Sequence, residues 1–204
     1  MTPAAARLGF AAASYLLGAF PTGYLLIRSR TRRDIRSLGS GATGATNVLR
    51  VGGWRAALPV AVIDLVKGAI PAYVALQLFR DPAFSAQAAS LAVLGHCYPV
   101  YIGFRGGKGV ATAAGAMAAL APLPAAASLA LFAAVVAATH YVSLGSILAA
   151  AAFPGFALLS GVAPSVAAWS VPIVLIILVR HAANIRRLLA GRELKLGAQG
   201  RTIR

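Results

Sequence analysis

The stretch of sequence that decides the fold is residues 109–179, which read GVATAAGAMAALAPLPAAASLALFAAVVAATHYVSLGSILAAAAFPGFALLSGVAPSVAAWSVPIVLIILV. It contains no Lys, Arg, Asp or Glu. A water-soluble domain cannot present so long a stretch without charge, whereas a membrane-spanning helix needs only about 20 predominantly apolar residues. The stretch therefore predicts a chain that crosses a membrane several times.

The composition of the whole chain agrees with this interpretation. Of its 204 residues, 59% are hydrophobic, the mean hydropathy is +0.79 and the formal net charge is +15. Positive loops mark the cytoplasmic side of a membrane protein and contact anionic lipid, so membrane lipid is an expected partner. No nucleic-acid partner is expected, because the chain offers no soluble domain to bind one. The single cysteine, Cys97, excludes an internal disulfide.

Three further spans are expected ahead of this stretch, and the arginines around them set their orientation. The spans run over about residues 4–27, 56–79 and 85–102, the first with a kink near Pro21. The arginines that follow the first span far outnumber the single Arg7 at its start. That loop is therefore cytoplasmic, and the N-terminus lies outside.

The basic C-terminal segment also marks the cytoplasmic side, so an even number of crossings must fit between Lys108 and Arg180. Four crossings fit, with breaks near residues 121–124, 140–143 and 161–164. The predicted fold is an all-α integral membrane protein of about seven transmembrane helices, some short or kinked. Its N-terminus is outside and its C-terminus is cytoplasmic. Five full spans are the alternative, if one pair of helices is re-entrant.

The chain is expected to form one domain. Residues 1–204 would be a single polytopic membrane domain, of which residues 185–204 are a cytoplasmic tail. With the predicted topology, every distinctive polar segment lies on the cytoplasmic side of the membrane.

The first polar segment is GSGATGATNVLR at residues 39–50. It contains the G-x-G-x-x-G pattern, but here the pattern follows a membrane helix and not a strand, so dinucleotide binding is not expected. A loop of Gly, Ser, Thr and Asn closed by Arg50 suits an anionic, hydroxylated ligand, with Gly41, Thr46 and Asn47 as candidate binding residues. A plain flexible loop is the alternative.

The second polar segment is GFRGGKG at residues 103–109. Glycines let backbone N–H groups close around an anion, the following helix points its positive dipole end there, and Lys108 adds a full charge. A Walker A loop would need Gly at 102 and Ser or Thr at 109, where this chain has Ile102 and Gly109, so ATP is disfavoured. The segment predicts a phosphate site; a glycine turn with a lysine reaching lipid is the alternative.

Two more polar segments follow, THYVSLGS at residues 139–146 and RHAANIRR at residues 180–187. On a helix, His181 and Asn184 share one face at the membrane surface. A helix boundary and a membrane anchor are the alternatives for these segments. Within the second span, Asp64 and Lys67 also share a face, and they are expected to pair with each other or with the loops, because charges inside a membrane are costly.

The chemistry open to this chain is limited by its scarcity of acids, since it has only four Asp and Glu residues. A metal site built from several carboxylates is therefore not expected, nor is any cofactor. The histidines form no HExxH pattern, and the His-x4-Asp box of common acyltransferases is missing. The amides, hydroxyls, Arg and Lys that remain stabilise negative charge, which suits an activated substrate that carries phosphate.

Three motifs resemble those of the bacterial acyl-phosphate:glycerol-3-phosphate acyltransferase family: GSGxxGATNVLR at 39–50, GHxYPVxxGFRGGKGVAT at 95–112 and RHxxNIxRLLxGxE at 180–193. The similarity covers nearly the whole chain in order and spacing. It implies a membrane glycerol-3-phosphate acyltransferase that moves a fatty acyl group from acyl-phosphate to the sn-1 hydroxyl of glycerol 3-phosphate. The products are lysophosphatidic acid and phosphate, in the first step of phospholipid synthesis.

The resemblance also implies roles for particular residues. Catalytic roles fall to Ser40, Arg50, Lys108, His181 and Asn184, and substrate-binding roles to Gly106, Gly107, Ser143 and Glu193. Two positions depart from the family pattern, Ala42 and Ala182, where polar residues are usual.

The expected mechanism is acyl transfer without a covalent enzyme intermediate. Lys108, Arg50 and loop amides would hold the phosphates, and the hydroxyl proton would pass to the substrate phosphate or to His181. The resemblance places the enzyme in the bacterial inner membrane with its active site facing the cytoplasm. It admits the soluble enzyme that produces acyl-phosphate as a partner. A transporter of a phosphorylated small metabolite is the alternative function.

Overall fold

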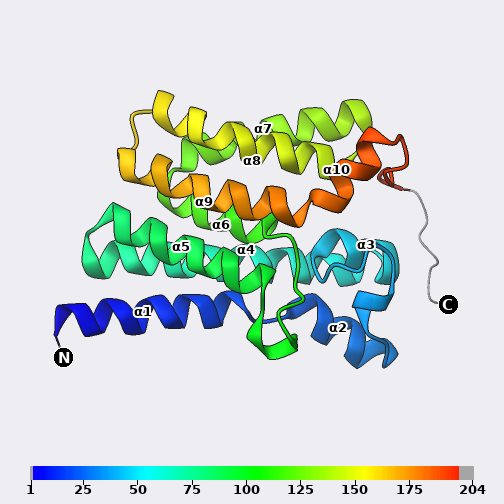
Figure 1. The fold of residues 1–204 in the computed structure, drawn as a ribbon, viewed down its shortest axis with the longest axis horizontal. Coiled ribbons are helices and arrows are strands. Elements are labelled where there is room, and N and C mark those ends of the chain that lie inside the picture. The colour runs from blue at the N-terminus through cyan, green and yellow to red at the C-terminus, as the bar shows by residue number, and fades with distance from the viewer. Residues whose placement is uncertain (1, 198–204) are drawn as a thin grey trace.

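The computed structural model describes residues 2–197, and within them every regular element is a helix (Figure 1). In this described part of the chain, ten α-helices are joined by short turns and by two single-turn 3₁₀ helices, Ile35–Ser37 and Val100–Ile102. The α-helices are α1 Pro3–Gly18, α2 Thr22–Thr31, α3 Ala45–Gly52, α4 Trp54–Phe79, α5 Pro82–Cys97, α6 Val110–Leu120, α7 Pro122–Thr139, α8 Val142–Leu159, α9 Pro164–Arg180 and α10 Ala182–Leu189.

Within residues 2–197, four helical segments are long and apolar enough to cross a membrane, judged by length and composition. They are α1 with α2, α4, α7 and α8, and α9 with α10 makes a fifth if that pair, bent by 58°, is one span. The predicted kink near Pro21 is confirmed, because α1 ends at Gly18 and α2 begins at Thr22. Four helices, α6 to α9, lie between Lys108 and His181, with breaks where the sequence predicts them.

One boundary differs from the prediction. The third span was expected to reach residue 102, but α5 ends at Cys97, because the residue before Pro99 is disfavoured in helical conformation. The expected tail from residue 185 begins inside α10, and the chain then turns back, with the Leu196 N–H donating to the His140 carbonyl at 2.6 Å. Residues 198–204 of that tail lie outside the described residues.

The helices approach closely because small residues line their contacts. On α4, a Cβ added to Gly68 would lie 1.9 Å from the Thr112 carbonyl oxygen of α6. On α6, a Cβ added to Gly115 would lie 1.9 Å from the Leu65 carbonyl oxygen of α4. The two glycines therefore set the α4–α6 distance from both sides, as small residues do between membrane helices.

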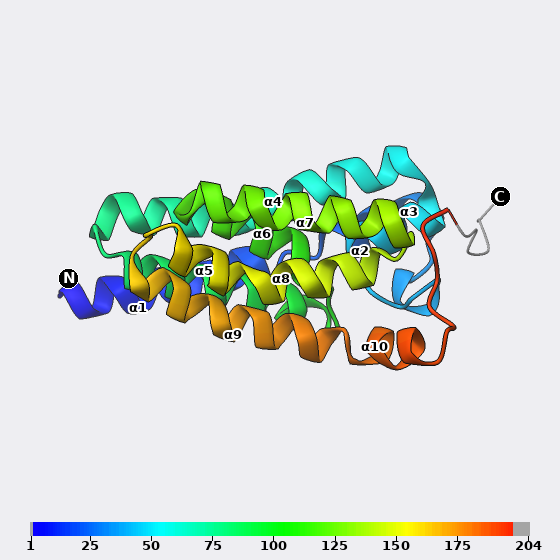
Figure 2. The same cartoon turned by 90° about the horizontal axis from the view of Figure 1, so that it is seen from above.

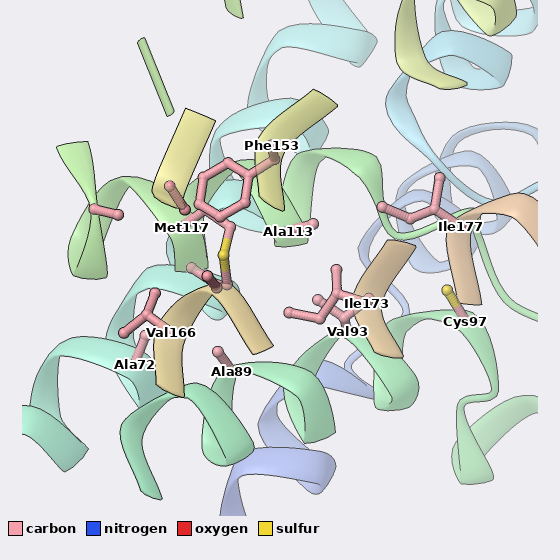
Figure 3. Packing of buried hydrophobic residues seen from close by; sticks show 14 residues of the cluster. Ala72, Ala89, Val93, Cys97, Ala113, Met117, Phe153, Val166, Ile173 and Ile177 are labelled. Carbon is pink, nitrogen blue, oxygen red and sulfur yellow. The ribbon is translucent and has the colours of Figure 1, made fainter. Parts of the chain in front are cut away.

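The largest buried cluster joins α4, α5, α6, α8 and α9. Figure 3 shows Met117 of α6 beside the ring of Phe153 of α8, and Val93 of α5 near Ile173 of α9. Alanines fill most of the remaining positions, so the helices pack closely around a few large side chains.

Figures 1 and 2 show α2, α3 and α10 at the end of the bundle opposite the N-terminus. The segment before α3, the bend before α10 and the turn between α7 and α8 all lie toward this end. Polar segments that are far apart in the sequence therefore meet at one end of the molecule.

Candidate active site

A cavity of about 460 Å³ lies between the helices, within the size range of small-molecule sites. Its apolar wall comes from the buried cluster and from α7, with Met117, Phe132, Phe153 and Ile173 among the lining side chains. Its polar wall comes from the segment before α3, from α3 itself, from Lys108 and from the bend between α9 and α10. The cavity thus suits a ligand with an anionic end and an apolar end.

Most of the residues predicted from sequence line this cavity. Nine of the twelve do so: Ser40, Thr46, Asn47, Arg50, Lys108, Ser143, His181, Asn184 and Glu193. Three do not: Gly41, Gly106 and Gly107. All three exceptions are glycines, which have no side chain to present to the cavity and act through the conformation of the backbone.

The loop before α3 is folded by the side chain of Asn47. The Asn47 Oδ1 accepts from the Ser40 N–H at 2.8 Å, and its Nδ2 donates to the carbonyls of Leu38 and Ala42 at 3.0 and 2.8 Å. Gly41 has φ of +75°, which a glycine adopts at little cost. Asn47 is therefore committed to the loop, and its effect on the cavity is to place Ser40.

The glycine loop is bound on both sides by the protein itself. The Gly106 and Gly107 N–H groups donate to the carbonyls of Cys97 and His96 at 3.2 and 3.1 Å. Their own carbonyls accept from Arg180 at 2.9 Å each. A Cβ on Gly107 would lie 2.0 Å from His96 Nε2, so no side chain fits there. These two amides are therefore already paired, unlike the open phosphate cradle that the sequence suggests.

Lys108, the next residue, reaches into the polar wall and joins a chain of hydrogen bonds. Its Nζ donates to Asn184 Oδ1 at 2.6 Å, and Asn184 Nδ2 donates to Glu193 Oε1 at 2.6 Å. The same carboxylate accepts from Ser143 Oγ at 2.9 Å and from Arg187 Nε at 2.7 Å. Four predicted residues from three separate parts of the sequence thus form one hydrogen-bond network.

The charges of this network are shaped by burial. Burial lowers the pKa of Lys108 to about 8. The Glu193 carboxylate opposes this shift, and the nearby Arg187, Arg50 and Arg180 add to it. Burial by itself raises the pKa of Glu193, but the hydrogen bonds from Asn184, Arg187 and Ser143 outweigh it, and the pKa is lowered. An anion in the cavity would stabilise the charged form of Lys108.

Arg50 is the other cation of the polar wall. Within residues 2–197 its guanidinium makes no hydrogen bond, and burial lowers its pKa from the ordinary value. The first turn of α6 adds donors, since no side chain among the described residues caps it and Val110 and Ala111 line the cavity. Arg50, Lys108 and this helix end together give the site a strong preference for anions.

His181 is buried at the bend between α9 and α10, and it lines the cavity. Its Nδ1 lies 2.8 Å from the Ile177 carbonyl, which can only accept, so Nδ1 carries the proton. The neutral ring therefore keeps a lone pair on Nε2, where it can accept a proton.

Asp64 and His96 also line the cavity, although neither was predicted from the sequence to be a site residue. The expected pair is confirmed, with Lys67 Nζ 2.8 Å from Asp64 Oδ1, and Lys67 also donates to the Phe20 carbonyl at 2.8 Å. His96 Nδ1 lies 3.7 Å from Asp64 Oδ1 and makes no hydrogen bond within the described residues. In the sequence, only the Gly-His pair at the start of the second motif, ahead of the glycine loop, drew attention to His96.

Within residues 2–197, no three His, Cys, Asp or Glu side chains come together as a metal site requires. The fold and the site define a class of protein: an all-helical membrane protein with a cavity that is cationic at one end and apolar along its length.

Comparison with known proteins identifies the family. The family model described as glycerol-3-phosphate acyltransferase matches residues 8–191. The glycerol-3-phosphate acyltransferase of Syntrophotalea carbinolica is 47% identical over 183 residues, which are 89% of this chain and 93% of that protein. The same enzyme of Geobacter sulfurreducens is 45% identical over 183 residues, with the same coverage of 89% and 93%. The chain belongs to the glycerol-3-phosphate acyltransferase family.

Two solved structures are similar to this chain in sequence and in fold. The crystal structure of PlsY (YgiH), an integral membrane glycerol 3-phosphate acyltransferase, in its glycerol 3-phosphate form is 37% identical, with a TM-score of 0.90 over 94% of this chain and 96% of that one. Its lysophosphatidic acid form is 36% identical, with a TM-score of 0.87 over the same shares. The all-helical fold is thus that of an integral membrane enzyme.

Proposed function

We propose that this protein transfers a fatty acyl group from acyl-phosphate to the sn-1 hydroxyl of glycerol 3-phosphate, giving lysophosphatidic acid and phosphate. The observation that carries the proposal is the cavity, in which Arg50, Lys108 and the N-terminal end of α6 face a long apolar wall. Both substrates carry a phosphate, and one of them carries an acyl chain. Membership of the family supports glycerol 3-phosphate as the acceptor, and the transporter alternative is not favoured.

The reaction needs no covalent enzyme intermediate. The sn-1 hydroxyl oxygen attacks the acyl carbonyl carbon, an ester bond forms, and the bond from that carbon to the phosphate oxygen breaks. Inorganic phosphate leaves with the electron pair, and the hydroxyl proton ends on it, either directly or by way of His181 Nε2. Lys108 and Arg50 hold the phosphates, while Ser40 and the amides of Val110 and Ala111 supply donors for the developing oxyanion.

The other residues of the site position the groups that contact the substrates. Asn184, Glu193 and Ser143 place the Lys108 ammonium, and Asn47 places Ser40. The apolar wall accommodates the acyl chain, whose transfer from water stabilises the bound donor.

The enzyme is proposed to be a multi-pass protein of the bacterial inner membrane, with seven crossings and its active site facing the cytoplasm. The basic segments that surround the polar end of the bundle support this orientation. A soluble enzyme that produces acyl-phosphate would then deliver its product on the same side.

The test is an assay of the purified protein with acyl-phosphate and radiolabelled glycerol 3-phosphate. We expect labelled lysophosphatidic acid, and no comparable product when acyl-CoA replaces acyl-phosphate. Robust turnover from acyl-CoA, without an enzyme that generates acyl-phosphate, would contradict the proposed donor. An absence of product from both donors would contradict the proposed function.

A further inference from the structure

Arg180, the last residue of α9, holds the glycine loop with a two-pronged contact. Its Nε donates to the Gly107 carbonyl and its Nη2 donates to the Gly106 carbonyl, both at 2.9 Å. The opposite edge of the loop is held by the carbonyls of His96 and Cys97 at the end of α5. Arg180 thus pins the loop against α5.

The guanidinium is itself held in place, and it lies outside the cavity. It stacks over the Tyr98 ring at 5.2 Å from the ring centre, and Arg180 is absent from the cavity lining. A planar fork of donors matches two consecutive carbonyls better than a point charge can. Arg180 is therefore placed to fix the protein backbone and not to contact a ligand in the cavity.

Residues on the two sides of the bend between α9 and α10 hold Lys108 at its backbone and at its ammonium. Arg180 fixes Gly106 and Gly107, which directly precede Lys108, while Asn184 in the next helix accepts from Lys108 Nζ at 2.6 Å. Loss of Arg180 would leave two carbonyls without their donor, at a cost that the loop can relieve by turning toward water. The backbone of Lys108 would then shift, while its Nζ stays hydrogen-bonded to Asn184.

We propose that Arg180 is a positioning residue, which holds the glycine loop in the one arrangement that directs Lys108 into the phosphate site. The proposal rests on the proposed acyl transfer, because it assigns Lys108 its phosphate. The role differs from that of a membrane anchor, which any basic residue at the end of α9 could fill.

The experiment compares Arg180→Met, Arg180→Lys and the matched control Arg186→Met. Arg186 is exposed and makes no side-chain hydrogen bond within residues 2–197, so its loss removes one positive charge from the same end of the bundle and leaves the loop untouched. We expect kcat/KM for glycerol 3-phosphate to fall about tenfold or more in Arg180→Met, to recover in part in Arg180→Lys, and to stay within about twofold in the control.

The pH profile separates positioning from a general loss of folded protein. Lys108 is faced by Arg50 of α3, Arg180 of α9, Arg187 of α10 and the Glu193 carboxylate. Removing Arg180 takes away a cation and loosens the loop around the ammonium, and both changes raise the pKa of Lys108. The alkaline fall in kcat/KM should therefore move to higher pH in Arg180→Met. A smaller folded fraction would lower the rate equally at every pH.

A second measurement does not depend on activity. Arg105 is exposed and directly precedes Gly106, so trypsin should cut there once the loop is released. We expect faster cleavage after Arg105 in Arg180→Met than in the wild type and in Arg186→Met, monitored by mass spectrometry. A wild-type protein without acyltransferase activity would contradict the proposed function and leave this result to decide the role of Arg180.

The proposal is overturned if Arg180→Met keeps kcat/KM within about threefold of the wild type. It is also overturned if the rate falls with an unchanged pH profile and unchanged cleavage, because Arg180 would then contribute only to overall stability.

Discussion

At the scale of single residues, the site depends on a few charged side chains, on how far each is withdrawn from water and on which groups hydrogen-bond to it. Lys108 is the clearest case. An ammonium withdrawn from water is costly unless it is paired, and the half-buried Lys108 has a neutral amide oxygen as its only hydrogen-bond partner within the described residues. The lysine is therefore held ready for an anion that completes its coordination.

Removing this ammonium should abolish most of the activity. Loss of one contact to transition-state charge typically costs about 3 kcal/mol, or roughly a hundredfold in rate. Lys108→Ala should lose about that much kcat/KM yet remain folded, and Lys108→Arg should recover only part, because a wider guanidinium must fit beside Gly107. Steady-state assays of the detergent-purified variants measure the loss. Turnover of Lys108→Ala within about threefold of the wild type would refute the assignment.

The pH dependence should report the same group. The pKa of Lys108 is about 8, below its ordinary 10.5, so the charged form is lost as the pH rises through about 8. We expect kcat/KM, which reflects the free enzyme, to fall over that range. The phosphate monoester changes charge near pH 6 and adds nothing there.

Lys108→Arg is the control for this profile. Arginine keeps its charge to about pH 12, so the alkaline fall should disappear from the range up to about pH 10, although the rate is lower. An identical fall in both proteins would show that another group titrates.

At the scale of helices, glycines decide how closely the elements approach. The α4–α6 contact is set by Gly68 and Gly115, whose added Cβ atoms would each lie 1.9 Å from a backbone oxygen of the facing helix. Such neighbours are backbone atoms and cannot move aside by a change of rotamer. The Lys108 loop leads directly into α6, so this contact also fixes the position of the site.

Gly115→Ala should therefore destabilise the protein by about 1–3 kcal/mol through overpacking. The matched control is Gly155→Ala in α8, where an added Cβ has nothing within 4 Å. The control should be neutral or stabilising by up to about 1 kcal/mol, because alanine favours helix. Thermal unfolding in detergent compares the two. Equal stability of both variants would contradict the close α4–α6 contact.

At the scale of the whole molecule, the segments before α3 and α10 and the α7–α8 turn lie toward one end of the bundle, and the short turns α4–α5 and α8–α9 lie at the other (Figures 1 and 2). This arrangement matches an enzyme that meets soluble substrates on one side of a membrane. The natural Cys97 is buried, so single introduced cysteines can report the orientation against a low background.

With the N-terminus outside and the C-terminus inside, a membrane-impermeant thiol reagent should label Arg80→Cys and Ser160→Cys in sealed cells. Lys108→Cys should react only after the cells are opened. The expectation follows from the excess of arginines around the polar end. Labelling of Lys108→Cys from outside would overturn the proposed orientation, whatever the number of crossings.

The sequence by itself determined the class of the protein and most of the residue types in its site. A charge-free stretch as long as residues 109–179 cannot form the surface of a water-soluble domain. The Pro, Gly and His residues within it mark where its helices end. Helix boundaries such as the kink at Pro21 could be predicted because they depend on neighbouring residues. The end of α5 at Cys97 was missed, although Pro99 signalled it.

The tertiary structure alone decided what each polar group does. Lys108 and Asn184 are 76 residues apart in the sequence, and Arg180 is 73 residues from Gly107. Sequence spacing cannot reveal such pairings, because they form only when separate helices pack. The glycine loop shows the consequence, because its composition suggested open N–H groups for a phosphate. In the structure the Gly106 and Gly107 N–H groups donate to carbonyls at the end of α5, their carbonyls accept from Arg180, and Lys108 is left to face the cavity.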